Sequence, residues 1–160
     1  TKCDQLNGPG LRVVLWVAGC SHHCDECQNS YSWNPEQGIK FDDSIKQEIF
    51  CELEKDWCSG ITYSGGDPMF ESNRKEIIEL AKEIREKFPN KTQWLYTGYC
   101  WKDIVEDQSM IDILKYVDVI CDGRYEKSLR NVDLEWVGSS NQHIIDVKKR
   151  IETISKLSSI

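Results

Sequence analysis

Short apolar segments alternate with amphipathic helical patterns along this chain. Strands are predicted at residues 12–18 and within the segments GITYSGGDP, TQWLYTGY, VDVICDG and HIIDV, and helices at residues 43–57, 72–88, 101–106 and 109–116. A helix between two strands returns the chain to the same end of the sheet, so the two strands pair in parallel. The sequence therefore predicts an α/β fold with a mostly parallel sheet and right-handed connections.

The two longer predicted helices have recognisable starts. Ser44 and Ser72 precede the apolar periodicity, and a serine hydroxyl there can accept a hydrogen bond from a free backbone N–H of the first turn. In the first helix the apolar side chains recur four residues apart as far as Trp57, so this helix is expected to continue that far.

Polar and glycine-rich groups follow the first four predicted strands. They are the cysteine-rich segment 19–30, Ser64-Gly65-Gly66-Asp67-Pro68, Thr97-Gly98-Tyr99 and Asp122-Gly123-Arg124-Tyr125. Parallel sheets bind their ligands at the C-terminal ends of the strands. We therefore expect these four loops to meet at one edge of the sheet and to form one site.

The first of these loops, GCSHHCDECQNS, contains Cys20, Cys24 and Cys27 in the spacing C-x3-C-x2-C. Three thiolates on one loop can each bind a corner iron of a [4Fe–4S] cluster and leave the fourth iron without a protein ligand. A tetrahedral zinc site completed by a histidine or a remote cysteine is the alternative, and spacing alone leaves both open. His22 and His23 lie too near the cysteines in sequence for unstrained binding of one ion, so exposed imidazoles are expected.

The other five cysteines show no ligand spacing. Cys51 falls within a helical pattern and Cys121 near the end of an apolar strand, so both are predicted to be small buried side chains. Cys3, Cys58 and Cys100 are given no role.

Composition excludes several classes of function. The chain of 160 residues has a net charge of −7 and no run of lysine and arginine, which argues against nucleic acid as a partner. Its apolar segments are too short to span a membrane, and no basic-then-apolar secretion signal is visible, so a reducing cytoplasm is the expected compartment. The length is typical of one domain, residues 1–160.

The segment NGPGLRVVLWVAGCSHHCDECQN resembles the opening signature of the radical-SAM activating enzymes. The shared features are Gly8-Pro9-Gly10, Arg12, Gly19-Cys20, Cys24, Cys27 and Asn29. The further segments SGGDP, YTGY, VDVICDGRYE and WVGSSNQ resemble one subgroup, the activators of the anaerobic (class III) ribonucleoside-triphosphate reductases. The resemblance extends from about residue 4 to residue 147.

The resemblance implies that Cys20, Cys24 and Cys27 hold a [4Fe–4S] cluster and are the catalytic residues. It also implies that S-adenosylmethionine (SAM) binds the iron without a protein ligand through its amino and carboxylate groups. An electron from the reduced cluster then cleaves SAM to methionine and a 5′-deoxyadenosyl radical, with the protein supplying position and exclusion of side reactions. A fourth protein ligand would block the place of SAM.

Further SAM contacts are expected around the cluster loop. Backbone groups of Glu26, Cys27 and Gln28 are expected near the adenine, although Glu26 stands where the superfamily usually has an aromatic residue. Asn29 is expected to bond the loop backbone rather than the ligand. Arg12 is expected to make a structural bond.

The other strand-end loops complete the predicted SAM site. Glycines let a backbone approach a ligand closely, so the carbonyls of the Ser64, Gly65 and Gly66 turn are expected to face the methionine ammonium. Asp67 either adds a carboxylate or fixes its own turn. Two strand-end side chains, Thr97 and Asp122, are expected near the ribose or the methionine part, and Arg124 either pairs with the methionine carboxylate or is a solvated charge.

The length limits the architecture and implies a partner. A closed eight-stranded (β/α) barrel typically needs about 250 residues, so an incomplete, open barrel of the radical-SAM type is expected. The resemblance implies that the large subunit of the anaerobic reductase covers the open side and receives a glycyl radical, and that a flavodoxin or ferredoxin donates the electron. Trp101, Tyr125 and Trp136 are candidates for the contact surface, with core packing as the alternative.

Two other functions stay open. One is a small radical-SAM enzyme of the deazapurine-forming kind, and the other is a zinc or iron–sulfur module without catalysis. The last segment, 148–160, is predicted to be either a docking helix or a frayed tail.

Overall fold

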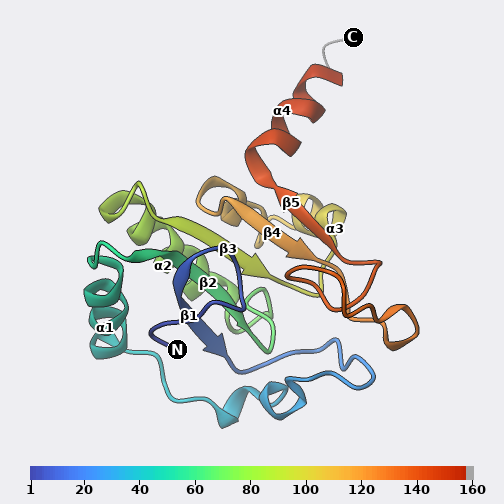
Figure 1. Cartoon of the computed structure of the whole chain (residues 1–160), viewed down its shortest axis with the longest axis horizontal. Coiled ribbons are helices and arrows are strands. Elements are labelled where there is room, and N and C mark those ends of the chain that lie inside the picture. Colours follow the sequence, from blue (N-terminus) through green and yellow to red (C-terminus); the bar gives the residue numbers. More distant parts are fainter. Residues whose placement is uncertain (158–160) are drawn as a thin grey trace.

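The fold is built on an open sheet of five strands, which Figure 1 shows in the computed structural model of the chain. The structure describes residues 1–157. The strands are β1 (Leu11–Val17), β2 (Cys58–Gly65), β3 (Thr92–Tyr96), β4 (Val119–Asp122) and β5 (His143–Asp146), and they lie in that order. The first three pairings are parallel and β4–β5 is antiparallel. The predicted α/β fold with a mostly parallel sheet is confirmed.

Within residues 1–157, four α-helices accompany the sheet. They are α1 (Asp43–Leu53), α2 (Arg74–Lys87), α3 (Trp101–Glu106) and α4 (Val147–Leu157). Because consecutive parallel strands lie side by side, right-handed crossovers bring their connecting segments to the same face of the sheet, and Figure 1 shows α2 and α3 behind it. The helix predicted at 109–116 is a 3-10 helix at Ile111–Lys115.

Helix ends differ from the predictions in ways that have local causes. Asp42, not Ser44, caps α1, because its carboxylate accepts a hydrogen bond from the N–H of Ile45 at 3.0 Å. This helix ends at Leu53, and Trp57 lies beyond it with 42% of its surface exposed. The predicted start of α2 at Ser72 is also wrong, because the helix begins after Asn73.

The two faces of the sheet have different environments, as the two-residue period of a strand requires. One face carries Val13, Ile61, Leu95 and Ile120, which pack into the hydrophobic core with Leu80 of α2. A buried hydrogen bond from the Tyr63 hydroxyl to Gln93 Oε1, at 2.6 Å, joins β2 and β3 within this layer. Burial raises the pKa of Tyr63 above its usual value, so this hydroxyl keeps its proton.

Arg12, on the opposite face, is completely buried. Its guanidinium donates to Thr62 Oγ1 at 2.9 Å, to Thr92 Oγ1 at 2.9 Å and to the carbonyl of Ile61 at 2.9 Å, and it lies over the Trp94 ring. Burial lowers its pKa to about 10. The predicted structural role of Arg12 is confirmed, because these bonds tie β1 to β2 and β3.

Two of the cysteine predictions meet different outcomes. Cys121 on β4 is buried, as predicted, with 1% of its surface exposed. The prediction for Cys51 is wrong, because it lies on the solvent side of α1 and is exposed. In the sequence, Cys51 lies between the buried pairs Ile49–Phe50 and Glu52–Leu53. The helical period nevertheless directs its side chain outward.

The last helix projects away from the rest of the molecule (Figure 1). Within α4 the buried residue is Val147, whereas Ile151 and Leu157 are 42% and 68% exposed. The predicted docking tail 148–160 extends into residues 158–160, which lie outside the described residues. Among residues 1–157, no helix combines the length and apolar character needed to cross a bilayer.

A candidate cluster and cofactor site at the strand ends

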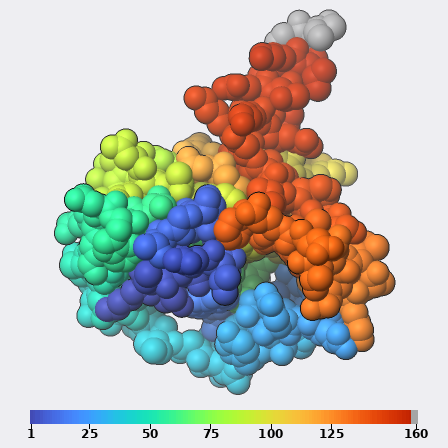
Figure 2. All heavy atoms as spheres, in the orientation of Figure 1, coloured from blue at the N-terminus to red at the C-terminus, as the bar shows by residue number. Residues whose placement is uncertain are grey.

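A large hollow lies at the C-terminal ends of β1 to β4. Figure 2 shows it between the N-terminal segment, the loop after β1 and the orange segment that follows β4. The cavity has a volume of about 610 Å³, and all four predicted loops contribute residues to its lining. The expectation that these loops meet at one edge of the sheet is confirmed, since parallel strands deliver their C-terminal ends to the same place.

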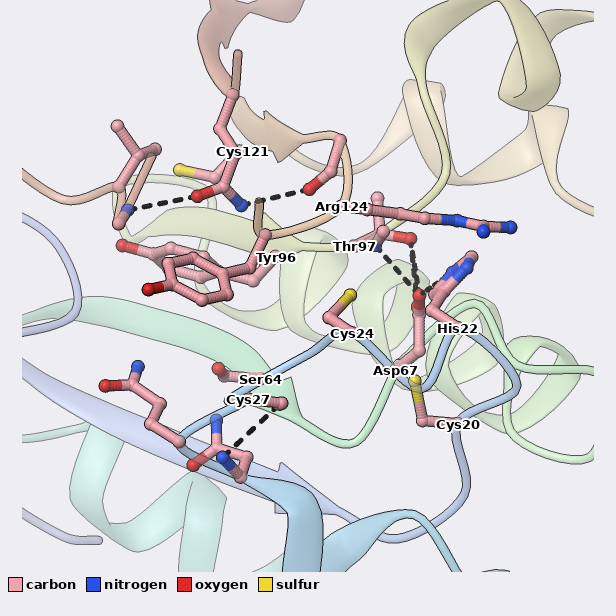
Figure 3. Close-up of a pocket in the computed structure, with 18 of the residues that line it drawn as sticks. Cys20, His22, Cys24, Cys27, Ser64, Asp67, Tyr96, Thr97, Cys121 and Arg124 are labelled. Atoms are coloured by element: carbon pink, nitrogen blue, oxygen red, sulfur yellow. Dashed lines mark hydrogen bonds and ion pairs between the residues drawn. The ribbon is translucent and has the colours of Figure 1, made fainter. Parts of the chain in front are cut away.

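Cys20, Cys24 and Cys27 line this cavity, and Figure 3 shows them in the loop that follows β1. All three are free thiols. The loop returns toward the sheet through backbone bonds, from the N–H of Gly19 to the carbonyl of Ser32 at 2.8 Å and from the N–H of Cys20 to the carbonyl of Trp33 at 3.0 Å. These hydrogen bonds therefore join the two ends of the loop that carries the thiols.

The sulfur of Cys27 accepts a hydrogen bond from the backbone N–H of Asn29 at 3.4 Å. Burial raises the pKa of the Cys20 and Cys24 thiols, and nearby backbone N–H groups act in the opposite direction, those of His22 and His23 on Cys20 and that of Tyr125 on Cys24. Hydrogen bonds to sulfur tune an iron–sulfur cluster, so backbone N–H groups in this loop suit thiolates that ligate iron.

The arrangement of these thiols fits a cubane cluster. In a [4Fe–4S] cluster each cysteine binds a different iron, so the three sulfurs surround the cluster rather than one point. Within the described part of the chain, no three His, Cys, Asp or Glu side chains converge as ligands of a single ion. Three free thiols on the wall of one cavity therefore match the donor set of a [4Fe–4S] cluster.

His22 departs from the prediction. Its side chain was expected to be exposed, but only 5% of it is accessible, and its Nε2 atom lies 2.8 Å from Asp67 Oδ2. His23 is exposed, as expected, and lies against the Trp33 ring with 4.7 Å between ring centroids. His22 is thus bonded to the loop after β2, in a role that its position between two cysteines did not indicate.

The Ser64-Gly65-Gly66 turn presses against the cysteine loop. The N–H of Gly66 donates to the carbonyl of Val17 at 2.7 Å, and the N–H of Asp67 donates to the carbonyl of Gly19 at 2.8 Å. A Cβ at Gly66 would lie 2.5 Å from the Gly19 oxygen, so only glycine fits. Ser64, Gly65 and Gly66 all line the cavity.

Asp67 fixes its own turn, which is one of the two predicted alternatives. Its carboxylate accepts the N–H of Met69 at 2.8 Å, the Thr97 hydroxyl at 2.9 Å and the N–H of Gly98 at 2.9 Å, in addition to the His22 contact. Only 1% of Asp67 is exposed. Thr97 is therefore directed at Asp67 as well, and the pair joins the ends of β2 and β3 beside the cavity (Figure 3).

The remaining predicted contacts fall into two groups. Glu26 and Gln28 line the cavity, and the Glu26 carboxylate forms an ion pair with Lys127 at 2.6 Å. Asp122 is not among the residues that line the cavity. Its carboxylate accepts the N–H of Trp101 at 2.8 Å and pairs with His143 Nδ1 at 3.0 Å. The structure thus brings Glu26 and Gln28 to the cavity and assigns the carboxylate of Asp122 to protein partners.

Sequence reasoning missed most of the wall that faces the cysteines. This wall comes from the long segment between β4 and β5, and it includes Arg130, Val132, Leu134 and Trp136. Trp136 has a φ of 65° and meets Trp94 edge to face, with ring centroids 6.0 Å apart. The length of the segment was visible in the sequence, but its irregular backbone gave no periodic signal.

The three aromatic candidates for a contact surface are not equivalent. Trp101 is 8% exposed and belongs to the hydrophobic core, so core packing explains it. Tyr125 and Trp136 are partly exposed and line the cavity. Arg124 is exposed and also lines the cavity, beside Thr97 and His22 in Figure 3.

Comparison with known proteins agrees with the site. Residues 6–145 match the family described as a 4Fe-4S single cluster domain. A protein of Enterobacteria phage T4 named anaerobic ribonucleoside-triphosphate reductase-activating protein is 45% identical over 142 residues, which cover 89% of this chain and 88% of the phage protein. Proteins of the same name from Vibrio cholerae and Escherichia coli K12 are 35% and 34% identical, covering 88% and 87% of this chain and 91% and 90% of their own.

These matches extend over the sheet, the cysteine loop and the wall of the cavity. A relative at this identity, aligned over nearly the full length of both chains, shares the fold. The chain therefore belongs to the family of anaerobic ribonucleoside-triphosphate reductase-activating proteins and contains a domain of the 4Fe-4S type.

Proposed function

We propose that this protein is a radical-SAM enzyme that generates a glycyl radical on an anaerobic ribonucleoside-triphosphate reductase. The observation that carries the proposal is the set of three free thiols on the wall of a cavity that continues past them to the strand-end loops after β2, β3 and β4. When bound there, a [4Fe–4S] cluster with one iron free of protein ligands supplies the electron that cleaves SAM, and the adenosyl radical takes a hydrogen atom from a glycine of the reductase.

In this proposal, different residues bind the cluster and SAM. Cys20, Cys24 and Cys27 hold the cluster. Ser64, Gly65 and Gly66 line the cavity beside the cysteine loop, and they offer backbone close to where SAM would lie. This turn and the cysteine loop are bonded directly to each other, so cluster and cofactor would be held in one fixed relation.

The polar residues at the site have supporting roles in this proposal. Glu26 and Gln28 face the cavity and bind the adenine part through their backbone. Asp67 and Thr97 stabilise the floor at the ends of β2 and β3, next to the place proposed for SAM. Asp122 acts in the same way at the end of β4, where its carboxylate holds the start of α3.

The names of the relatives support a proposal for the partner protein of this chain. The relatives are named for activating the anaerobic reductase, so the large subunit of that enzyme is the proposed target. We infer that the open sheet is a partial (β/α) barrel of the radical-SAM type, whose uncovered side the reductase closes against water. A reduced flavodoxin or ferredoxin is the proposed electron donor, and the cytoplasm is the proposed compartment.

The test is anaerobic reconstitution with iron and sulfide, followed by reduction and addition of SAM. We expect a cubane EPR signal that SAM perturbs, together with formation of 5′-deoxyadenosine. Both should be lost in Cys24→Ala and kept in Cys51→Ala, because Cys51 is exposed on α1, away from the cavity. Tightly bound zinc and indifference to SAM would overturn the proposal.

The reductase distinguishes the proposed target from other substrates. Addition of its large subunit to the reduced enzyme and SAM should yield a glycyl radical signal. Cleavage of SAM without that radical would contradict the proposed target and favour a small-molecule substrate.

A further inference from the structure

Part of the cavity wall between β4 and β5 is a loop whose two ends are bonded to each other. The N–H of Asn131 donates to the carbonyl of Gly138 at 3.1 Å, and the N–H of Ser140 donates to the carbonyl of Leu129 at 2.9 Å. We call residues 129–140 the wall loop, which belongs to the orange segment in Figure 2. The residues of this loop that line the cavity are Arg130, Asn131, Val132, Leu134, Trp136, Val137 and Gly138.

The side chain of Gln142 binds the base of this loop. Its Oε1 atom accepts hydrogen bonds from the N–H of Gly138 at 3.0 Å, from the N–H of Ser139 at 3.2 Å and from the Ser139 hydroxyl at 3.3 Å. Its Nε2 atom donates to the carbonyl of Gly123 at 2.9 Å. Gly123 directly follows the last residue of β4, so one amide side chain joins the wall loop to the end of this strand.

The partners of this amide determine its orientation. An amide oxygen only accepts hydrogen bonds, and an amide nitrogen only donates them. If the group were turned over, its nitrogen would face the N–H groups of Gly138 and Ser139, and its oxygen would face the carbonyl of Gly123. The oxygen of Gln142 therefore binds the wall loop, and the nitrogen binds the strand end.

Two further hydrogen bonds join the same parts of the chain. The Nδ2 atom of Asn141 donates to the carbonyl of Arg124 at 2.8 Å. The N–H of Glu126 donates to the hydroxyl oxygen of Ser139 at 3.1 Å. The segment that directly follows β4 and the segment that directly precedes β5 are thus bonded to each other beside the cavity.

The wall loop has no core of its own to hold it in place. Among residues 129–140, Ser139 alone is buried, and Val132 is 73% exposed. Trp136 has a φ of 65°, a backbone conformation that residues with a side chain rarely adopt. A segment that buries so little apolar surface opens easily, so the bonds at its base determine where this loop lies.

We propose that Gln142 is a positioning residue that keeps the wall loop at the end of β4 and thereby sets the affinity of the cavity for SAM. The wall loop lines the same cavity as the three cysteines. A pocket covers most of the surface of its ligand, so a wall that moves away removes contact area. The inference rests on the proposed function, because it takes SAM as the ligand of this cavity.

The test uses the full chain and four variants. Gln142→Met keeps a side chain of similar length and loses both hydrogen-bonding groups, whereas Gln142→Glu keeps an oxygen that accepts from Gly138 and Ser139 and loses the donor to Gly123. Ser139→Ala removes the hydroxyl at the base of the loop. Gln37→Met is the matched control, because Gln37 is exposed and is not among the residues that line the cavity.

The first measurement is hydrogen exchange of the wall loop, which does not require the cluster. The amides of Asn131 and Ser140 report on it, because their bonds close the loop. We expect exchange in residues 129–140 to be at least tenfold faster in Gln142→Met and faster in Ser139→Ala, with the rates in β2 unchanged. Gln142→Glu and Gln37→Met should exchange at close to the wild-type rate.

The second measurement is the affinity of the reconstituted protein for SAM. The Kd is obtained from the change that SAM causes in the EPR signal of the cluster, and the KM and kcat from formation of 5′-deoxyadenosine. In Gln142→Met we expect Kd and KM to rise about tenfold with a much smaller change in kcat, because a binding surface is lost. Partial unfolding would instead lower kcat and leave KM unchanged. Gln142→Glu should recover most of the affinity.

Wild-type affinity for SAM in both Gln142→Met and Ser139→Ala would overturn the inference and leave the proposed function standing. A weaker response to the reductase with unchanged SAM affinity would overturn it as well, because the wall loop would then serve the partner protein. Should Gln142→Met fail to fold, Ser139→Ala decides the question by the same two measurements. A wild-type protein that forms no cubane or ignores SAM would instead overturn the proposed function, and the inference with it.

Discussion

Arg12 shows how one residue can stabilise the whole sheet edge. Its guanidinium is fully buried and has no carboxylate partner among residues 1–157. Its donors bond hydroxyl and carbonyl oxygens of β2, β3 and the preceding segment. Burial of an unpaired cation costs free energy, which the lowered pKa of about 10 reflects. The hydrogen bonds must offset that cost, so they cannot be lost singly without consequence.

Arg12→Met should therefore destabilise the protein by roughly 3 kcal/mol, because several buried oxygens lose their donor while the apolar volume is kept. The measurement is urea unfolding of the metal-free, reduced protein. Lys2→Met is the matched control, since Lys2 is exposed and should change the free energy of unfolding by less than about 0.5 kcal/mol. Equal stability of the two variants would contradict the structural role of Arg12.

Among the elements, the cysteine loop and the turn after β2 lie so close together that no side chain fits between them at Gly66. Gly66 meets the carbonyl oxygens of Gly19 and Ser32, which a Cβ would approach to 2.5 Å and 2.9 Å. The same two segments exchange backbone hydrogen bonds. The thiols are therefore placed by β2 as much as by their own loop.

Gly66→Ala should separate these two segments and lower the iron bound per chain after reconstitution at least severalfold. The sheet should persist, because the clash lies beyond the last residue of β2. Iron and sulfide analysis, together with far-UV circular dichroism, measures both effects. Full iron content in Gly66→Ala would show that the loop holds its cluster without support from this turn.

A carboxylate at the start of α3 makes the contribution of this helix to stability depend on pH. Asp103 accepts the N–H of Cys100 at 2.9 Å, and hydrogen bonds from the side chain and backbone of Cys100 lower its pKa. A carboxylate with a lowered folded pKa stabilises the fold above its ordinary value of about 3.8, and this contribution is lost as the pH falls through the folded value.

Asp103→Asn should accordingly flatten the acid side of the stability profile. Because asparagine does not titrate, the free energy of unfolding should fall less steeply below about pH 3.8 in the variant than in the wild type. Urea unfolding of the metal-free protein at several acidic pH values gives both slopes. Parallel profiles would mean that the Asp103 cap does not contribute to the acid sensitivity.

At the scale of the whole molecule, two parts are distinct: the sheet with its loops, which we call the body, and the last helix, α4. The family match ends at residue 145, before α4 begins. The buried residue of this helix is its first, Val147. We therefore assign the sheet and its loops to the chemistry and propose docking to the reductase for the segment 148–160.

Deletion of residues 151–160 tests that division. We expect the truncated protein to keep its cluster and its SAM cleavage, because the cavity is lined by residues up to Gln142. Its affinity for the reductase should fall at least tenfold, measured by the concentration needed for half-maximal glycyl radical formation. Unchanged affinity would identify the segment as a frayed tail, whereas loss of SAM cleavage would contradict the assignment of chemistry to the body.

Much of the fold was predictable because its signals are local. Apolar strands, helical periodicity and the order of elements give a mostly parallel sheet, and the sheet places four loops together. The start of α1 was missed because Asp42 caps this helix in place of Ser44. The start of α2 was missed because the helix begins after Asn73, whose side chain donates to the carbonyls of Ala18 and Asp67 instead of capping the helix. Local sequence does not show which of two adjacent polar side chains reaches the free N–H.

The site was predictable where the type of a residue alone indicates its chemistry. It was not predictable where a role depends on contact with residues far away in the sequence. Three cysteines at this spacing indicate their own role. The burial of His22, by contrast, depends on Asp67, 45 residues away, and on the absence of a side chain at Gly98. The wall with Trp136 likewise depends on contact with Trp94 across the sheet.

The order of strands across the sheet is also the order of their synthesis. Each strand that leaves the ribosome finds its neighbour already made, which favours stepwise pairing during translation. Cys20, Cys24 and Cys27 emerge before any strand that pairs with β1, whereas the wall at Arg130–Trp136 emerges near the end. For most of its synthesis the nascent chain thus presents three uncovered thiols to iron, sulfide and oxidants alike, and this makes oxygen during translation a hazard distinct from oxygen during catalysis.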